Sequence, residues 1–119
     1  MRRALILAVT AGLLAGCGGQ HGGSPAGPAD KDVRLTSCAL SRKLHAGVVH
    51  GVITNTTGRT AGYVVQVDIV DGGGNRVDTA MHAETDVAPG EKAKFTASGV
   101  QTYGGRITCR VASVQRTTR

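Results

Sequence analysis

The sequence has few aromatic side chains, because it contains no Trp, one Phe and two Tyr among 119 residues. The core of a folded domain must therefore be filled mainly by Val, Ile and Ala. The motifs of common enzyme classes are also missing: there is no Gly-x-Ser-x-Gly elbow, no Walker phosphate loop, no His-Glu-x-x-His and no Cys-x-x-Cys. We therefore expect a protein that is not an enzyme and carries no cofactor.

No apolar stretch is long enough to span a bilayer, which takes about 20 residues. The longest, residues 4–14, follows Arg2 and Arg3, as in an export signal. Leu14-Ala15-Gly16-Cys17 meets all four positions of the lipobox, so this region resembles a bacterial lipoprotein signal. The resemblance implies that residues 1–16 are removed and that Cys17 carries diacylglycerol. The alternative is an ordinary secretory signal with a chance Cys at the cleavage site.

Cleavage before Cys17 would leave 103 residues and lower the formal net charge from +6 to +4, because Arg2 and Arg3 would be removed. We expect the mature protein outside the cytoplasm, held to the cell membrane by its lipid. An exported protein has little access to nucleic acid, so its positive charge favours anionic wall polymers or lipid headgroups. An envelope protein is another expected partner. Alternatively, the charge merely keeps the domain soluble.

The three cysteines have different expected roles. With Cys17 assigned to the lipid, Cys38 and Cys109 remain as an even pair in an oxidising compartment, and we predict a disulfide between them. A bridge that closes a loop of about 70 residues stabilises a domain by about 4 kcal/mol on the chain-entropy model. Two buried free thiols are the alternative.

The chain changes character near residue 33. Residues 17–32 are rich in Gly and Pro and lack apolar periodicity, which predicts a flexible tether. After that, apolar residues recur at every second position, and we predict a β domain over 33–116 followed by a tail over 117–119. The expected strands are Val33–Leu40, Gly47–Asn55, Gly62–Asp71, Arg76–Thr85, Lys92–Ala97 and Arg106–Val114.

We expect an all-β fold, an antiparallel two-sheet sandwich of immunoglobulin-like type with six or seven strands. Alternation places one side of each strand in the core, and on the strand over 62–71 this side carries Tyr63, Val65, Val67 and Ile69. The opposite side of that strand is the candidate partner surface, formed by Val64, Gln66, Asp68 and Val70. Cover by the tether or by another loop is the alternative.

Three short motifs suggest a family. Gly51-Val52-Ile53-Thr54-Asn55 is a glycine-containing strand that ends in Asn, and Val67-Asp68-Ile69-Val70-Asp71 ends in Asp. Pro89-Gly90-Glu91 is followed by Phe95. The segment 49–95 thus resembles the FxLYD domain, an immunoglobulin-like sandwich of bacterial and archaeal surface proteins, although the Phe and Tyr of the family's box are replaced. The family has no established active site, so the resemblance implies no catalytic residue.

The histidines do not define a metal site. His45 and His50 are five residues apart, so in one extended strand they would point to opposite faces. Whether His50 and His82 meet across neighbouring strands is left open by the sequence, and we assign no metal ligand. We therefore expect a non-catalytic, lipid-anchored binding or accessory domain at the bacterial envelope. The alternatives are a small ligand- or metal-binding lipoprotein and a subunit of an envelope enzyme or transport complex.

Overall fold

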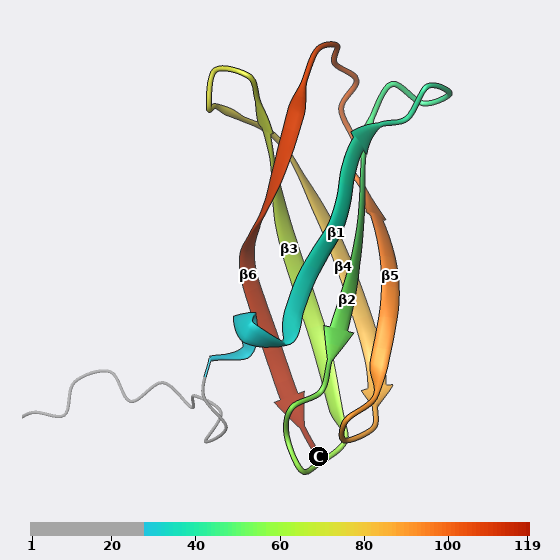
Figure 1. Cartoon of the computed structure of the whole chain (residues 1–119), viewed down its shortest axis with the longest axis vertical. Helices are drawn as coiled ribbons and strands as arrows, with labels where there is room; N and C mark the ends of the chain where they lie inside the picture. The colour runs from blue at the N-terminus through green and yellow to red at the C-terminus, as the bar shows by residue number, and fades with distance from the viewer. Residues whose placement is uncertain (1–27) are drawn as a thin grey trace, which may run out of the picture.

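The structure, a computed structural model, describes residues 28–119 (Figure 1). The predicted signal over 1–16 and the predicted lipid site at Cys17 lie outside these residues. A short 3-10 helix and six strands follow one another as η1 (Ala29–Asp32), β1 (Val33–Leu40), β2 (Gly47–Thr54), β3 (Ala61–Asp71), β4 (Arg76–Val87), β5 (Lys92–Ser98) and β6 (Ile107–Thr118).

The strands form two three-stranded sheets with the orders β1-β2-β5 and β4-β3-β6. Every pair of neighbouring strands is antiparallel. The two sheets face each other across the core, with the strands running along the length of the domain (Figure 1). The predicted all-β two-sheet sandwich is confirmed, with six strands.

The core follows the predicted alternation. Tyr63, Val65, Val67 and Ile69 of β3 are all buried, since β3 is the central strand of its sheet. From the other sheet, Phe95 supplies a second buried aromatic ring. Burying a side chain such as Val or Ile contributes about 1.5–3 kcal/mol, so a core with so few aromatic residues is still substantial.

The Phe95 ring lies against a strand position without a side chain. Gly51 of β2 is the cross-strand partner of Phe95 in β5. A Cβ atom built on Gly51 would overlap two atoms of the Phe95 ring. The glycine therefore provides the space that the ring occupies.

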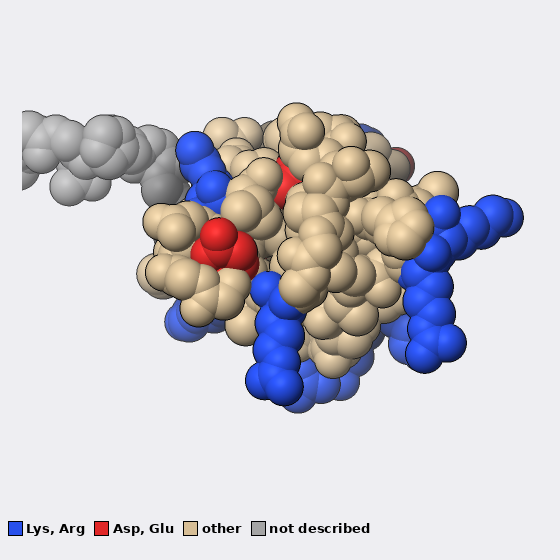
Figure 2. All heavy atoms as spheres, turned by 90° about the horizontal axis from the view of Figure 1, so that it is seen from above, with Lys and Arg blue, Asp and Glu red and all other residues tan. Residues whose placement is uncertain are grey.

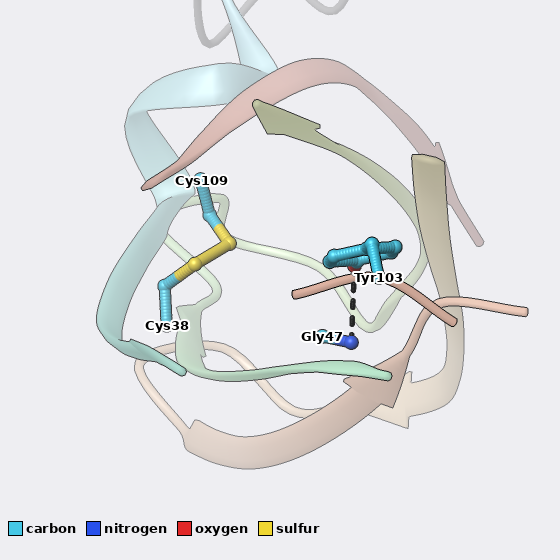
Figure 3. Close-up of a disulfide and its surroundings, with 4 residues drawn as sticks. All are labelled: Cys38, Gly47, Tyr103 and Cys109. Carbon is cyan, nitrogen blue, oxygen red and sulfur yellow. Dashed lines mark hydrogen bonds between the residues drawn. A yellow bond between two sulfur atoms is a disulfide. The ribbon is translucent and has the colours of Figure 1, made fainter. Parts of the chain in front are cut away.

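The predicted disulfide between Cys38 and Cys109 is present, and their Cα atoms are 5.9 Å apart (Figure 3). Cys38 lies in β1 and Cys109 in β6, which are edge strands of different sheets. The bond therefore joins the two layers of the sandwich. Since it spans 71 residues of chain, its expected contribution is about 4 kcal/mol on the chain-entropy model.

The β1–β2 and β5–β6 loops are hydrogen-bonded together at the upper end of Figure 1. The backbone N–H of Gly47 donates to the Tyr103 hydroxyl at 3.0 Å, as Figure 3 shows, and the Tyr103 N–H donates to the carbonyl of His45 at 3.1 Å. Burial raises the pKa of Tyr103, with a further contribution from the negative charge of Asp78. The neutral hydroxyl can therefore remain the acceptor for Gly47 at physiological pH.

Two of the three motifs that resemble the FxLYD pattern, the strand-ending Asn and the Pro-Gly-Glu turn, meet at the opposite end. Asn55 is buried, and its side-chain amide donates to the carbonyls of Arg59 at 2.7 Å and Val87 at 2.8 Å. Its backbone N–H donates to Glu91, and its carbonyl accepts from Gly90 at 2.8 Å. The strand-ending Asn and the Pro-Gly-Glu turn are therefore one structural unit, although they are distant in sequence.

The folded domain is longer than the predicted 33–116. At its start, Ala29–Asp32, which were predicted to be the end of the tether, form η1. The side chain of Asp32 is buried. At its end, β6 runs through Thr118, whose partner in β3 is Ala61, so the predicted tail over 117–119 lies largely in a strand. Apolar alternation misses both ends because polar side chains and backbone pairing hold them.

Candidate functional site

The structure does not support the predicted partner surface on β3 as a continuous exposed stripe. Val64 is 37% exposed and Gln66 is half-buried, but Asp68 and Val70 are only 8% and 7% exposed. The prediction that all four residues present one accessible surface is therefore wrong at Asp68 and Val70.

Two arginines surround the buried part of this stripe. Arg110 of β6 is the cross-strand partner of Asp68, and its Nε lies 3.4 Å from a carboxylate oxygen of Asp68. Arg76 of β4 approaches the same carboxylate at 4.0 Å, because a register shift in the β3–β4 pairing places Arg76 opposite Val70. Both arginine side chains are mostly exposed, so each ion pair contributes little to stability.

What remains of the surface is a small neutral patch. Val64 has Ala83 of β4 and Gln115 of β6 as cross-strand neighbours. Met81, which is paired with Gln66, is 61% exposed and was not singled out from the sequence. Alternation along the strand places Met81 on the outward-facing side, and this pattern could have identified it from the sequence.

The structure separates His50 from His82. The Nδ1 atom of His50 is 3.0 Å from the hydroxyl of Thr96, which is exposed, whereas the His82 ring stacks on Phe95 with the ring centroids 4.9 Å apart. His50 of β2 therefore lies with Thr96 on the outer side of the β1-β2-β5 sheet, whereas His82 belongs to β4 of the other sheet and contacts Phe95 from the inner side. His82 also contacts the Glu84 carboxylate at 2.8 Å. Within residues 28–119, no group of three or more His, Cys, Asp or Glu is placed to hold a metal ion.

A network of the buried side chains of Asp32, Tyr63 and Arg116, joined by the exposed Thr56, holds the start of the domain. One Asp32 carboxylate oxygen lies 2.7 Å from Nη1 of Arg116 and accepts a 2.7 Å hydrogen bond from the Tyr63 hydroxyl. The other oxygen accepts a 2.5 Å hydrogen bond from Thr56. The side chains of Asp32 and Arg116 are 0% and 1% exposed. This Asp32 network fastens η1 to β3 and β6 at the point where residues 1–27 join the domain.

The network keeps Asp32 ionised and Tyr63 neutral. Burial by itself would raise the pKa of Asp32, but hydrogen bonds from Thr56, Tyr63 and Arg116, together with the Arg116 charge, bring it below its usual value. Burial, followed by the hydrogen bond to Asp32, raises the pKa of Tyr63 to about 12. The network therefore holds one negative and one positive charge over the physiological pH range.

The two sheets differ in charge. Strands β1, β2 and β5 contain Arg34, Lys92 and Lys94 but no Asp or Glu, whereas the β4-β3-β6 sheet carries both carboxylates and arginines. In the end-on view of Figure 2, blue Lys and Arg side chains project from several sides of the molecule, and only small red areas are visible. The outer face of the β1-β2-β5 sheet is therefore a second candidate surface. From the sequence, alternation predicts that Lys92 and Lys94 face outward, but it does not predict which residues of other strands lie beside them.

No helix in the described part of the chain is both long and apolar enough to span a membrane. Compared with models of protein families, with curated proteins and with solved structures, the chain matches none.

Proposed function

We propose that this protein is a lipid-anchored binding or accessory domain on the extracytoplasmic side of a bacterial cell membrane, and that it is not an enzyme. The anchor would be diacylglycerol on Cys17, exposed as the first residue by removal of residues 1–16. Two acyl chains are enough for stable anchoring, since each buried CH₂ contributes about 0.8 kcal/mol and one chain gives only marginal binding.

The observation that carries this proposal is the disulfide between Cys38 and Cys109. Disulfides persist in oxidising compartments and are rare in the cytosol, so the bond favours an exported protein. It also occupies both cysteines of the domain, and Cys17 is the one cysteine that remains. Cys17 is the last residue of the lipobox.

The FxLYD-like identity is part of the same proposal. The residues that match the family pattern have structural roles here: Asn55 binds the turn that contains Gly90 and Glu91, and Asp71 accepts two 2.9 Å hydrogen bonds from the backbone of the β3–β4 turn. Phe95 fills the space opposite Gly51. Such a pattern specifies a sandwich, which supports a role as a structural binding module.

Binding on the outside of the sandwich fits the way the core is filled. Buried side chains of β2, β3, β4 and β5 occupy the space between the sheets. Contacts with a partner would therefore fall on the outer sheet faces or on the loops. The outer face of the β1-β2-β5 sheet, whose strands carry cations and no Asp or Glu, is one such surface.

Fractionation of cells that express the full chain tests the anchor. We expect the wild-type protein in the membrane fraction and released by detergent, whereas Cys17→Ala loses membrane retention and leaves the domain folded. Cys38→Ser is the matched control, because it removes a different cysteine and should stay membrane-bound. Retention of Cys17→Ala in the membrane, or loss of the wild-type protein from it, would contradict the proposal.

A further inference from the structure

We propose that the outer face of the β1-β2-β5 sheet docks onto the anionic phosphate headgroups of the membrane that carries the lipid anchor. The cationic part of this surface, called the basic face below, consists of Lys31, Arg34, Lys92 and Lys94. The inference rests on the proposed function, because the anchor is what brings the basic face close to that membrane.

Strand register brings the cations of the basic face together. Arg34 of β1 and Lys94 of β5 are the two cross-strand neighbours of Val52 in β2, so they flank the same residue. Lys92 lies two residues from Lys94 and therefore on the same side of β5, opposite Thr54. Lys31 of η1 lines the same shallow hollow of about 400 Å³, and all four cationic side chains are exposed.

Few carboxylates are available to neutralise these cations, and the exposed one in η1 is Asp30, next to Lys31. The three strands of the sheet contain no Asp or Glu. Asp32 also lines the hollow, but its carboxylate is buried and paired with Arg116. Glu91, next to Lys92 in sequence, accepts a 2.8 Å hydrogen bond from the backbone of Ala88 within its turn. A phosphate-bearing surface is therefore the complementary partner.

The position of the basic face favours the anchoring membrane over a distant polymer. Lys31 and Arg34 lie where the chain enters the domain, and Lys92 begins β5 at the same end of the sandwich (Figure 1). Only residues 18–27 separate Cys17 from the described part of the chain. Ten residues extend to at most about 35 Å, so a lipid on Cys17 would keep this end of the domain near the headgroups at high effective concentration.

The lysines allow a direct test of the docking. The chain has four, and they lie at the two opposite ends of the sandwich, so one end serves as the control for the other. Lys31, Lys92 and Lys94 belong to the basic face, and Lys43 is exposed in the β1–β2 loop at the other end. The lipidated mature protein is placed in vesicles of phosphatidylcholine, with or without phosphatidylglycerol. A water-soluble acetylating reagent then labels the amines, and mass spectrometry measures the rate at each lysine.

With phosphatidylglycerol present, we expect acetylation to slow several-fold at Lys31, Lys92 and Lys94 but not at Lys43, and high salt should abolish the difference. Equal rates at the three lysines in both kinds of vesicle, or an equal slowing at Lys43, would overturn the inference. If soluble polyphosphate protects the three lysines more strongly than the anionic vesicles do, the basic face is a polymer site and the inference is also overturned. Binding of the lipidated protein to vesicles of phosphatidylcholine alone tests the lipid anchor separately from the docking of the basic face.

Matched variants make the test specific. Arg34→Gln, Lys92→Gln and Lys94→Gln together remove three exposed cations, and Lys31 remains as the reporter. Because each Lys or Arg near an anionic surface raises partitioning about fivefold, docking should weaken on the order of a hundredfold at low salt, and Lys31 should lose its protection. The control combines Arg42→Gln, Lys43→Gln and Arg106→Gln, which removes the same charge from the opposite end and should leave Lys31 protected. Equal behaviour of the two triple variants would overturn the inference.

Discussion

Replacing Arg116 with Met should destabilise the domain more than any exposed charge substitution. In the native protein, Nη1 of Arg116 lies 2.7 Å from the Asp32 carboxylate, and both side chains are almost completely buried. Removal of one partner from a buried ion pair costs about 3–5 kcal/mol, because the other charge loses its counter-charge. Tyr63 and Thr56 still donate hydrogen bonds to the carboxylate, so we expect the lower end, about 3 kcal/mol.

Urea unfolding followed by circular dichroism measures this loss, and for a domain of this size it corresponds to a fall in Tm of about 15 °C. The matched control is Arg119→Met. Arg119 forms a 2.8 Å ion pair with Asp86, but their side chains are 67% and 57% exposed. An exposed pair contributes at most about 1 kcal/mol. Equal losses for the two variants would refute the reasoning.

The pH dependence identifies Asp32 as the source of the loss. Its folded pKa lies below the unfolded value of 3.8, so the stability it contributes is complete above pH 3.8 and is lost as the pH falls through the folded pKa. Without Arg116, the pKa of the buried carboxyl should rise, and protonation should then relieve the unpaired charge. The loss caused by Arg116→Met should therefore shrink between pH 7 and pH 4. A constant loss over that range would show that the pair is not its cause.

Three further predictions concern other contacts. Cys38→Ser should lower the free energy of unfolding by about 4 kcal/mol, and reduction of the wild-type protein should do the same; an unchanged Tm after reduction would count against the bridge. Gly51→Ala should lower the free energy of unfolding by about 1–3 kcal/mol, because the added Cβ overlaps the Phe95 ring. Gly62→Ala is the control, since the nearest atom to its added Cβ is 3.6 Å away. Similar urea midpoints for the two variants would exclude this overlap. The pKa of Tyr63 rises from 10.0 to about 12, so its contribution is complete below pH 10 and falls by about 3 kcal/mol as the pH rises to 12. In urea unfolding at a series of pH values, Tyr63→Phe should remove this loss of stability at high pH. An unchanged dependence of stability on pH would show that Tyr63 is not its cause.

Much of the fold could be predicted from the sequence because it depends on local patterns. Alternation along β3 identified Tyr63 and Ile69 as core residues, and both are buried. The expected oxidising compartment pointed to the pairing of Cys38 with Cys109, which the structure contains. Strand ends were less accurate, as at Thr118, because backbone pairing continues after the apolar pattern has faded.

The features that sequence reasoning missed depend on contacts between distant segments. Asp32 and Arg116 are 84 residues apart, and no periodicity connects them. The partner surface on β3 was wrong at Asp68 and Val70, which are buried, and Arg110 of β6 and Arg76 of β4 approach the Asp68 carboxylate from the neighbouring strands. Register brings together the basic face, whose members come from η1, β1 and β5.

Mass spectrometry of the protein isolated from membranes is the most direct test of the central claim, that an anchored and disulfide-bonded sandwich lies outside the cytoplasm. We predict an N-terminal peptide that begins at Cys17 and carries the mass of diacylglycerol, together with a peptide pair linked through Cys38 and Cys109. A soluble intracellular protein that retains residues 1–16 and has free thiols at Cys38 and Cys109 would contradict the account.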